Sequence, residues 1–195
     1  MDRLVYIAMS GAQETLRAQA ANSHNLANAS TTGFRADLSA FQSLAVAGDG
    51  LASRAYAVDT SIGWDSTSGG LEQTGRDLDV AINGPGWLAV QAPDGSEAYT
   101  RAGDLRVTAT GLLTTGAAHP VLGDGGPLTV PPNAAISVAR DGSVSIVPLG
   151  QGAQTLSTVG RIKLVNPPDS ALQRGADGLF RRVDGTQAPP DAGVQ

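Results

Sequence analysis

Two aspartates, Asp77 and Asp79, lie two residues apart in a stretch where polar and apolar side chains alternate. Leu78, Val80 and Ile82 are the apolar members, so the spacing predicts a half-buried strand. Residues two apart on a strand share a face. Paired carboxylates on one face could provide the acid and base for glycoside hydrolysis. Solvated aspartates are far commoner on strands, and a hydrolase would rest on these two residues alone.

The other residues that could do chemistry are two histidines and six Asp-Gly pairs. His24 and His119 have no acidic or cysteine companion at the spacing of metal ligands. The pairs begin at Asp49, Asp94, Asp124, Asp141, Asp177 and Asp184. None belongs to the Asp-x-Asp-x-Asp-Gly ladder of a calcium loop, so tight turns explain them. There is also no Gly-x-Ser-x-Gly nucleophile elbow and no phosphate loop. We expect no catalytic, cofactor-binding or metal-binding residue.

The bulk composition narrows the class of protein further. The 195 residues suit one medium domain with an appendage, and 25 glycines with 11 prolines favour β structure with many turns. The formal net charge is -5, whereas a nucleic-acid surface needs clustered basic residues. Cysteine is absent, which excludes a disulfide framework.

The first element is a long helix in the stretch that begins at Arg3. Asp2 is a plausible N-cap, and no proline interrupts the pattern. Gln13, Glu14 and Arg17 break the apolar run, so a signal peptide and a membrane span are both disfavoured. The predicted stripe consists of Leu4, Ala8, Ala12, Leu16 and Ala20, widened by Val5, Met9 and Leu26. One helix cannot bury such a stripe alone, so we expect it to need a partner.

A polar segment ends the helix. Asn25 and Asn28 can each donate and accept hydrogen bonds through their amides. The hydroxyls of residues 30–32 compete with helix continuation, and Gly33 can adopt positive φ. Residues 36–69 read as an extended linker, in which Asp37 to Val46 could form a short helix that ends at residues 48–50. Residues 55–59 and 61–64 are expected to be extended.

Residues 70–187 have the pattern of an all-β domain, followed by a loop-like tail over 188–195. Turn signals recur at the spacing of a sandwich or barrel. Strands are expected near residues 78–83, 87–91, 99–101, 105–108, 112–114, 120–123, 128–130, 136–138, 144–147, 161–165 and 179–183. The predicted fold is therefore mainly β with an N-terminal α-helix: an antiparallel sandwich or barrel-like domain, a terminal amphipathic helix and a linker.

The end of the helix resembles the N-terminal signature of bacterial flagellar rod and hook proteins. The matching residues are Asn25-Leu26-Ala27-Asn28, Thr31, Gly33, Phe34 and Arg35, whereas His24 stands where a second asparagine is usual. Residues 78–88, 99–103, 111–114, 120–123 and 141–144 resemble later blocks of the same family, with Trp87-Leu88 in place of its aromatic pair. Residues 1–12 look most like the proximal-rod branch, and the distal-rod and hook branches are the nearest alternatives.

The resemblance implies a structural subunit of the flagellar basal-body rod rather than an enzyme. Such a subunit would polymerise through terminal helices into the torque-transmitting shaft that spans the periplasm. Its partners would be itself, neighbouring rod and hook-type subunits and the flagellar type III export apparatus, with no cleaved signal peptide. No nucleic acid or small-molecule substrate is implied. The expected assembly interface comprises Leu4, Ala8, Ala12, Leu16, Asn25, Leu26, Asn28, Thr31, Gly33 and Phe34.

The C-terminal residues also depart from the family pattern. Members end in a second amphipathic helix that pairs with the first, whereas residues 188–195 are loop-like, so we expect a C-terminal truncation. Without that partner the first helix should fray, project or pack on a neighbouring molecule. The alternative from another class is a secreted or cell-surface β domain that binds a ligand such as a carbohydrate. It would need an exposed aromatic platform, for which Trp64, Trp87, Tyr56 and Tyr99 are available.

Overall fold

A computed structural model describes residues 4–45, 55–151, 155–191 and 193–194 of the chain. The chain divides into two compact units, Met1–Thr67 and Ser68–Gln195. The expected N-cap Asp2 and the expected break at residues 48–50 lie outside the described residues. Within those residues, every helix is too short or too polar to cross a membrane.

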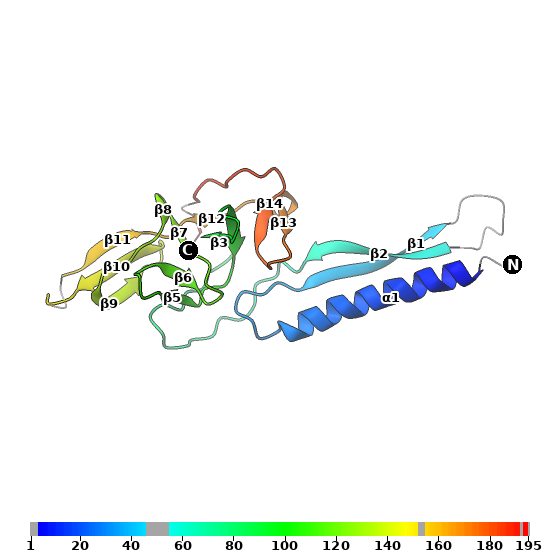
Figure 1. Cartoon of the computed structure of the whole chain (residues 1–195), viewed down its shortest axis with the longest axis horizontal. Coiled ribbons are helices and arrows are strands. Elements are labelled where there is room, and N and C mark those ends of the chain that lie inside the picture. The colour runs from blue at the N-terminus through cyan, green and yellow to red at the C-terminus, as the bar shows by residue number, and fades with distance from the viewer. Residues whose placement is uncertain (1–3, 46–54, 152–154, 192, 195) are drawn as a thin grey trace. The chain divides into compact units, whose positions relative to one another are not determined.

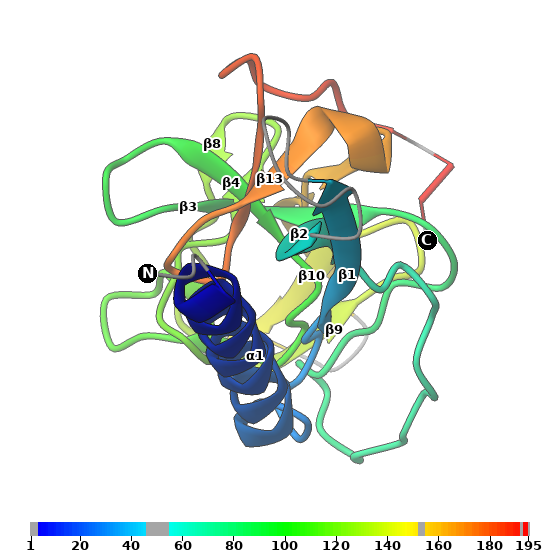
Figure 2. The same cartoon turned by 90° about the vertical axis from the view of Figure 1, so that its right-hand side faces the viewer.

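Unit 1 consists of a helix and a β hairpin (Figure 1). Helix α1 (Leu4–Ala27) confirms the long helix that the sequence predicts. Strands β1 (Asp37–Ala45) and β2 (Ala55–Trp64) pair antiparallel along their lengths, with one irregularity between Leu38 and Ser39. Both strands contact α1, and Figure 2 shows the helix running beside the hairpin.

The expected short helix at residues 37–46 is wrong, because residues 37–45 form strand β1. A helix of about ten residues is marginal by itself, whereas residues 37–45 gain a ladder of cross-strand pairs with β2 along the whole strand. The two extended pieces expected at 55–59 and 61–64 are confirmed, as parts of the single strand β2.

Unit 2 is built from short antiparallel strands in several small sheets that do not close into a barrel (Figure 1). The largest has the order β12-β3-β4-β14-β13, and a second has the order β11-β10-β9. Two strand pairs, β5-β6 and β7-β8, complete the unit. The elements are β3 (Trp87–Gln91), β4 (Glu97–Thr100), β5 (Leu105–Val107), β6 (Leu113–Thr115), β7 (Leu122–Gly123), β8 (Gly126–Pro127), β9 (Asn133–Val138), β10 (Ser143–Pro148), β11 (Ser157–Arg161), β12 (Leu164–Val165), η1 (Asp169–Ala171), β13 (Leu172–Arg174) and β14 (Phe180–Arg182).

The prediction of a strand at residues 78–83 is wrong, although the apolar side chains of this segment pack in the core as expected. Only Asp79 pairs, through a single bridge to Asp104. Ile82 nevertheless lies in the hydrophobic core, and Leu78 and Val80 pack against that core. Residues 128–130 likewise make one bridge rather than a strand, between Thr129 and Leu112. The other expected strands of unit 2 correspond to strands or pairs of strands in the structure.

The guanidinium of Arg101 accounts for the bent backbone after residue 81. Nη2 donates to the carbonyl oxygens of Ile82 at 3.0 Å and Gly84 at 2.9 Å, and Nη1 donates to that of Gly86 at 3.0 Å. Gly84 and Gly86 have φ values of 96° and 135°, where a Cβ would be strained. The planar guanidinium therefore binds three carbonyls at once and stabilises a turn that a regular β-strand could not form.

A buried polar network joins β4 to the end of the chain. Lys163 Nζ lies 2.8 Å from both carboxylate oxygens of Glu97, and these side chains are 11% and 6% exposed. The Tyr99 hydroxyl donates to Glu97 and accepts the Ala188 N–H at 2.8 Å. Burial, aided by the Glu97 carboxylate, raises the pKa of Tyr99 to about 12.

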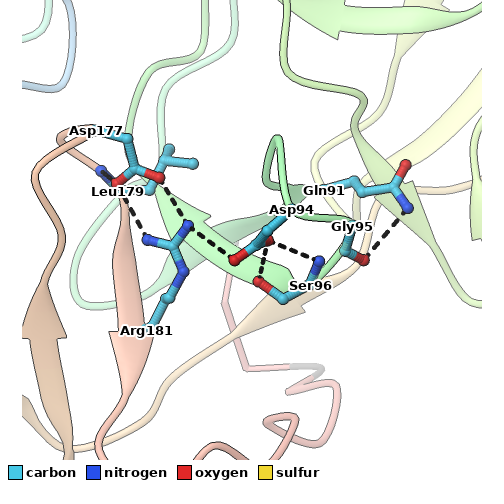
Figure 3. Close-up of polar contacts among 7 residues, drawn as sticks. All are labelled: Gln91, Asp94, Gly95, Ser96, Asp177, Leu179 and Arg181. Carbon is cyan, nitrogen blue, oxygen red and sulfur yellow. Dashed lines mark hydrogen bonds and ion pairs between the residues drawn. The ribbon is translucent and has the colours of Figure 1, made fainter.

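A second polar cluster joins the β13–β14 loop to the β3–β4 hairpin (Figure 3). Arg181 makes a two-pronged contact to Asp177 at 2.7 and 3.0 Å, and it lies 3.8 Å from Asp94. The hydrogen bonds from Arg181 hold the pKa of Asp177 below its usual range, and those from Ser96 do the same for Asp94. Both Asp-Gly pairs act in tight turns, as the sequence predicts.

Replacing Arg101 tests its role in the fold. Arg101→Ala should lower the free energy of unfolding of unit 2 by about 2–4 kcal/mol, because three carbonyls lose a charged donor. Urea unfolding should be followed by the fluorescence of Trp87 in a Trp64→Phe background. The matched control Arg140→Ala, at an exposed turn position, should change stability by less than about 0.5 kcal/mol. Equal effects of the two substitutions would contradict the assignment.

The raised pKa of Tyr99 predicts a loss of stability in base. The unfolded chain ionises this hydroxyl near pH 10, and the folded chain near pH 12. Its contribution is therefore complete below pH 10 and is lost as the pH rises through 12, by on the order of 2 kcal/mol. Unfolding free energies measured across that range should fall less steeply for Tyr99→Phe than for the wild type. Parallel slopes would contradict the prediction.

Candidate assembly surface

Helix α1 has two faces of different chemistry. The face that is buried or half-buried recurs every three or four residues and is rich in polar and small side chains. It comprises Ile7, Ser10, Gly11, Glu14, Ala18, Ala21, Asn25 and Asn28. Because both hairpin strands contact α1, this inner face is the one that the hairpin covers.

The opposite face of α1 is apolar and exposed, and we call it the outer stripe. It consists of Val5, Met9, Ala12, Leu16 and Ala20, which recur at helical spacing. Val5 is 71% exposed, Met9 53% and Leu16 65%. A helix of a soluble domain normally turns its apolar side inward, so the arrangement here is inverted. Exposed apolar rows of this kind mark sites of interaction with other proteins.

The structure leaves much of the expected stripe accessible. Ala8, Ala12 and Leu16 are exposed, as is Leu26 at 79%, whereas nothing is described of the Leu4 side chain. A step of four residues advances about 40° beyond a full turn, so the expected row winds around the helix. The outer stripe, with Val5 and Met9 as full members, is the row that stays on one face.

The prediction of a helix without a partner in its own chain is wrong. The inner face packs on the β1–β2 hairpin, which lies in the segment that the sequence predicts to be an extended linker. The outer stripe has no such cover among the described residues of unit 1, since its members are exposed.

Three further exposed apolar residues lie on β1 and were absent from the expected interface. Leu38 is 44% exposed, Phe41 56% and Leu44 61%. The sequence could have indicated these three residues, because they are the large apolar residues whose spacing is noted within residues 37–46. That spacing predicts a helix, whereas residues 37–45 pair with β2 as a strand.

Asn25 fixes the entry to the hairpin instead of facing outward. Its Nδ2 donates to the Asp37 carbonyl at 2.9 Å, and its Oδ1 accepts the Asp37 N–H at 2.9 Å. The side-chain amide thus pairs with Asp37 as a strand neighbour would. His24 lies beside the same residue, with Nδ1 3.4 Å from Asp37 Oδ2, and its ring meets Phe34 edge-on at 5.5 Å.

The remaining expected interface residues complete the end of the helix. Asn28 donates through Nδ2 to the His24 carbonyl at 2.9 Å, which satisfies a carbonyl of the last turn. The Thr31 hydroxyl lies 3.4 Å from Asn28 Oδ1, and Gly33 has a φ of 70°. Thr31 and Gly33 are exposed, and Phe34 is half-buried.

Arg35 joins the exit segment, which is residues 25–35, to the chain just after β2. The residue is 8% exposed, and its Nη1 donates to the carbonyls of Asp65, at 3.2 Å, and Thr67. The Ala36 carbonyl accepts the Asp65 N–H at 2.8 Å. The resemblance singled out Arg35, but its buried position follows only from the hairpin.

Asp77 and Asp79, the two carboxylates at the spacing of an acid–base pair, lie in different surroundings. Asp77 is exposed in a turn, whereas Asp79 is 17% exposed and lies 3.4 Å from Arg76. The described residues contain no group of three histidine, cysteine or acidic side chains placed to hold a metal ion. Trp87 is 4% exposed and Tyr99 1%, so neither offers a platform for a carbohydrate.

Two family models match the chain, one in each unit. Residues 5–35 match the model described as flagella basal body rod protein. Residues 81–146 match the D1 domain of flagellar hook protein FlgE/F/G. The first match covers α1 with the exit segment, and the second covers most of the strands of unit 2. Together they define a protein of the flagellar rod and hook class.

Curated relatives specify the member of that class. The chain is 48% identical to the flagellar basal-body rod protein FlgF of Escherichia coli K12, over 96% of this chain and 74% of the relative. FlgF of Salmonella typhimurium is 47% identical over the same shares. FlgF of Caulobacter vibrioides is 37% identical over 100% and 79%. The chain therefore belongs to the flagellar basal-body rod protein family, as a FlgF-like structural subunit of the rod.

The amide contacts of Asn25 predict a stability effect confined to unit 1. Asn25→Ala removes two hydrogen bonds to Asp37 and should lower the free energy of unfolding of unit 1 by about 1–3 kcal/mol. The measurement is thermal unfolding followed by helical circular dichroism, to which α1 is the main contributor. Asn22→Ala, at an exposed position of the same helix, makes the same change in helix propensity. If both variants shift the transition equally, the two hydrogen bonds do not stabilise the unit.

Proposed function

We propose that the outer stripe of α1 is the surface through which this rod subunit packs on copies of itself and on neighbouring rod and hook-type subunits. The observation that carries the proposal is the inverted helix. The inner face buries Glu14 and small residues against the hairpin, while Val5, Met9 and Leu16 remain in water. Full burial of such a side chain contributes about 1.5–3 kcal/mol, which only another surface could supply.

The small residues of the outer stripe suit close helix packing. Ala12 and Ala20 alternate with the larger Met9 and Leu16, so a neighbouring helix could insert its side chains between them. Contacts of one surface patch with a different patch on the next copy generate open helical assemblies. Such an assembly, with α1 in its axis, would transmit torque as a shaft.

The exit segment then acts as a positioning element. Asn25 and Arg35 bind the backbone of Asp37, Asp65 and Thr67, so α1 and the hairpin are presented together. Of the ten residues expected at the interface, Ala8, Ala12, Leu16 and Leu26 are proposed to contact neighbours directly. Asn25, Asn28 and Gly33 are proposed to act by holding the helix end in place.

The wider setting follows from the family. The subunit would act in the basal body across the periplasm, after passage through the flagellar type III export apparatus. Its work would be mechanical, with no reaction and no nucleic-acid or small-molecule substrate. The described residues contain no group placed to bind a metal ion, which is compatible with a mechanical role but is not evidence for it.

Sedimentation velocity over a concentration series tests the outer stripe. Leu16→Gln keeps a good helix former and the net charge, and should weaken association by more than about tenfold, because an apolar side chain no longer enters the interface. Leu71→Gln is a matched control, since Leu71 is 67% exposed in unit 2 and Leu16 is 65% exposed.

The outcomes are distinct. Association that is reduced by Leu16→Gln and unchanged by Leu71→Gln supports the proposal. Association that is insensitive to Leu16→Gln, or a wild-type chain that stays monomeric alone and with purified rod neighbours, would overturn it.

A further inference from the structure

We propose that Asn83 is a site of spontaneous deamidation whose rate is set by the grip of Arg101 on the surrounding turn. Asn83 is exposed and is followed by Gly84. It is the one asparagine of six in this chain that precedes a glycine. Glycine has no Cβ, so its backbone nitrogen can approach the preceding side chain more closely than that of any other residue.

The reaction needs only water. The Gly84 backbone nitrogen attacks Asn83 Cγ, a nitrogen–carbon bond forms, and the amide nitrogen leaves as ammonia. The product is a five-membered succinimide. Water then adds to either ring carbonyl and opens the ring, to give aspartate or the β-linked isoaspartate. The net change is the exchange of an amide and water for a carboxylic acid and ammonia.

The structure opposes the first step. Ring closure requires rotation of the backbone between Asn83 and Gly84. Arg101 holds the carbonyl before this bond, that of Ile82 at 3.0 Å, and the one after it, that of Gly84 at 2.9 Å. A third bond reaches Gly86 at 3.0 Å. The two flanking peptide groups are thereby tied to one rigid guanidinium, and the turn must open before the nitrogen can reach Cγ.

The Asp-Gly pairs could enter the same chemistry but are less reactive. An ionised carboxylate is a poor electrophile, and succinimide formation requires its protonated form. Hydrogen bonds from Ser96, Ser143 and Arg181 lower the pKa values of Asp94, Asp141 and Asp177, and the Thr186 N–H does so for Asp184. The Asn83 amide is neutral and has no such protection, so Asn83 is the expected position of change.

Modification would damage the turn permanently. Isoaspartate adds a methylene to the backbone between the Ile82 and Gly84 carbonyls, which then no longer match the spacing of the Arg101 fork. A chain held unfolded would accumulate this change, and its unit 2 could not re-form the Arg101 contacts. The folded chain would be spared.

Tryptic mapping of the full-length chain tests the proposal. Cleavage after Arg76 and Arg101 releases residues 77–101, which contain both Asn83-Gly84 and Asp94-Gly95. Wild-type protein should be incubated folded and in urea, and the deamidated fraction of this peptide followed by mass spectrometry with fragmentation. We expect deamidation at Asn83 to be more than about tenfold faster in urea, since the folded turn must first open.

Variants separate the effect of the Arg101 hydrogen bonds on the deamidation rate from the effect of general folding. Arg101→Lys keeps the charge and the cleavage site but loses the fork, so the folded protein should deamidate faster, whereas Arg140→Lys should match the wild type. If Arg101→Lys does not fold, urea below the wild-type unfolding midpoint gives the same comparison. Equal rates in folded and unfolded wild type, or modification at Asp94 in place of Asn83, would overturn the proposal.

Discussion

The reversal between α1 and β1 depends on one constraint: backbone groups that leave a helix and enter a strand must still find hydrogen-bond partners. Asn25 supplies them as a peptide would, with one donor and one acceptor on Asp37. Arg35 does so at the same end of the hairpin, where it binds the carbonyls of Asp65 and Thr67, just after β2. The polar residues that carry the family resemblance are therefore largely occupied inside the subunit.

Unit 2 meets the same constraint with the same chemistry. Arg101 binds three carbonyls of a turn that includes two positive-φ glycines, Gly84 and Gly86. Gly103 allows a further close approach, because a Cβ there would lie 1.8 Å from the Val80 carbonyl oxygen. Arginine and glycine thus act together: glycine permits the backbone conformation, and the guanidinium fixes it.

The sequence predicts those elements that are specified by residues close together in the chain. The spacing of α1, the Asp94-Gly95 and Asp141-Gly142 turns and most strands of unit 2 are confirmed. Residues 37–45 were wrongly predicted as part of a short helix, because their strand conformation depends on β2, which follows after residue 54. The bend after Ile82 depends on Arg101, a contact 19 residues away. The hydrogen bonds that Asn25 and Arg35 make also depend on the folded hairpin. The sequence shows that these residues can form such bonds, but it does not show which backbone groups they bind.

The hydrogen bonds of Asn25 and Arg35 also explain how α1 can leave its apolar side exposed to water. If the helix were held to the hairpin mainly by hydrophobic burial, Val5, Met9 and Leu16 would be needed on the inner face. Hydrogen bonds from Asn25 and Arg35 are directional and do not draw on those side chains. The inner face can then be small and polar, with Glu14 at 8% exposure, while the outer stripe stays available. Polar anchoring within the subunit is the condition that frees an apolar surface for its neighbours.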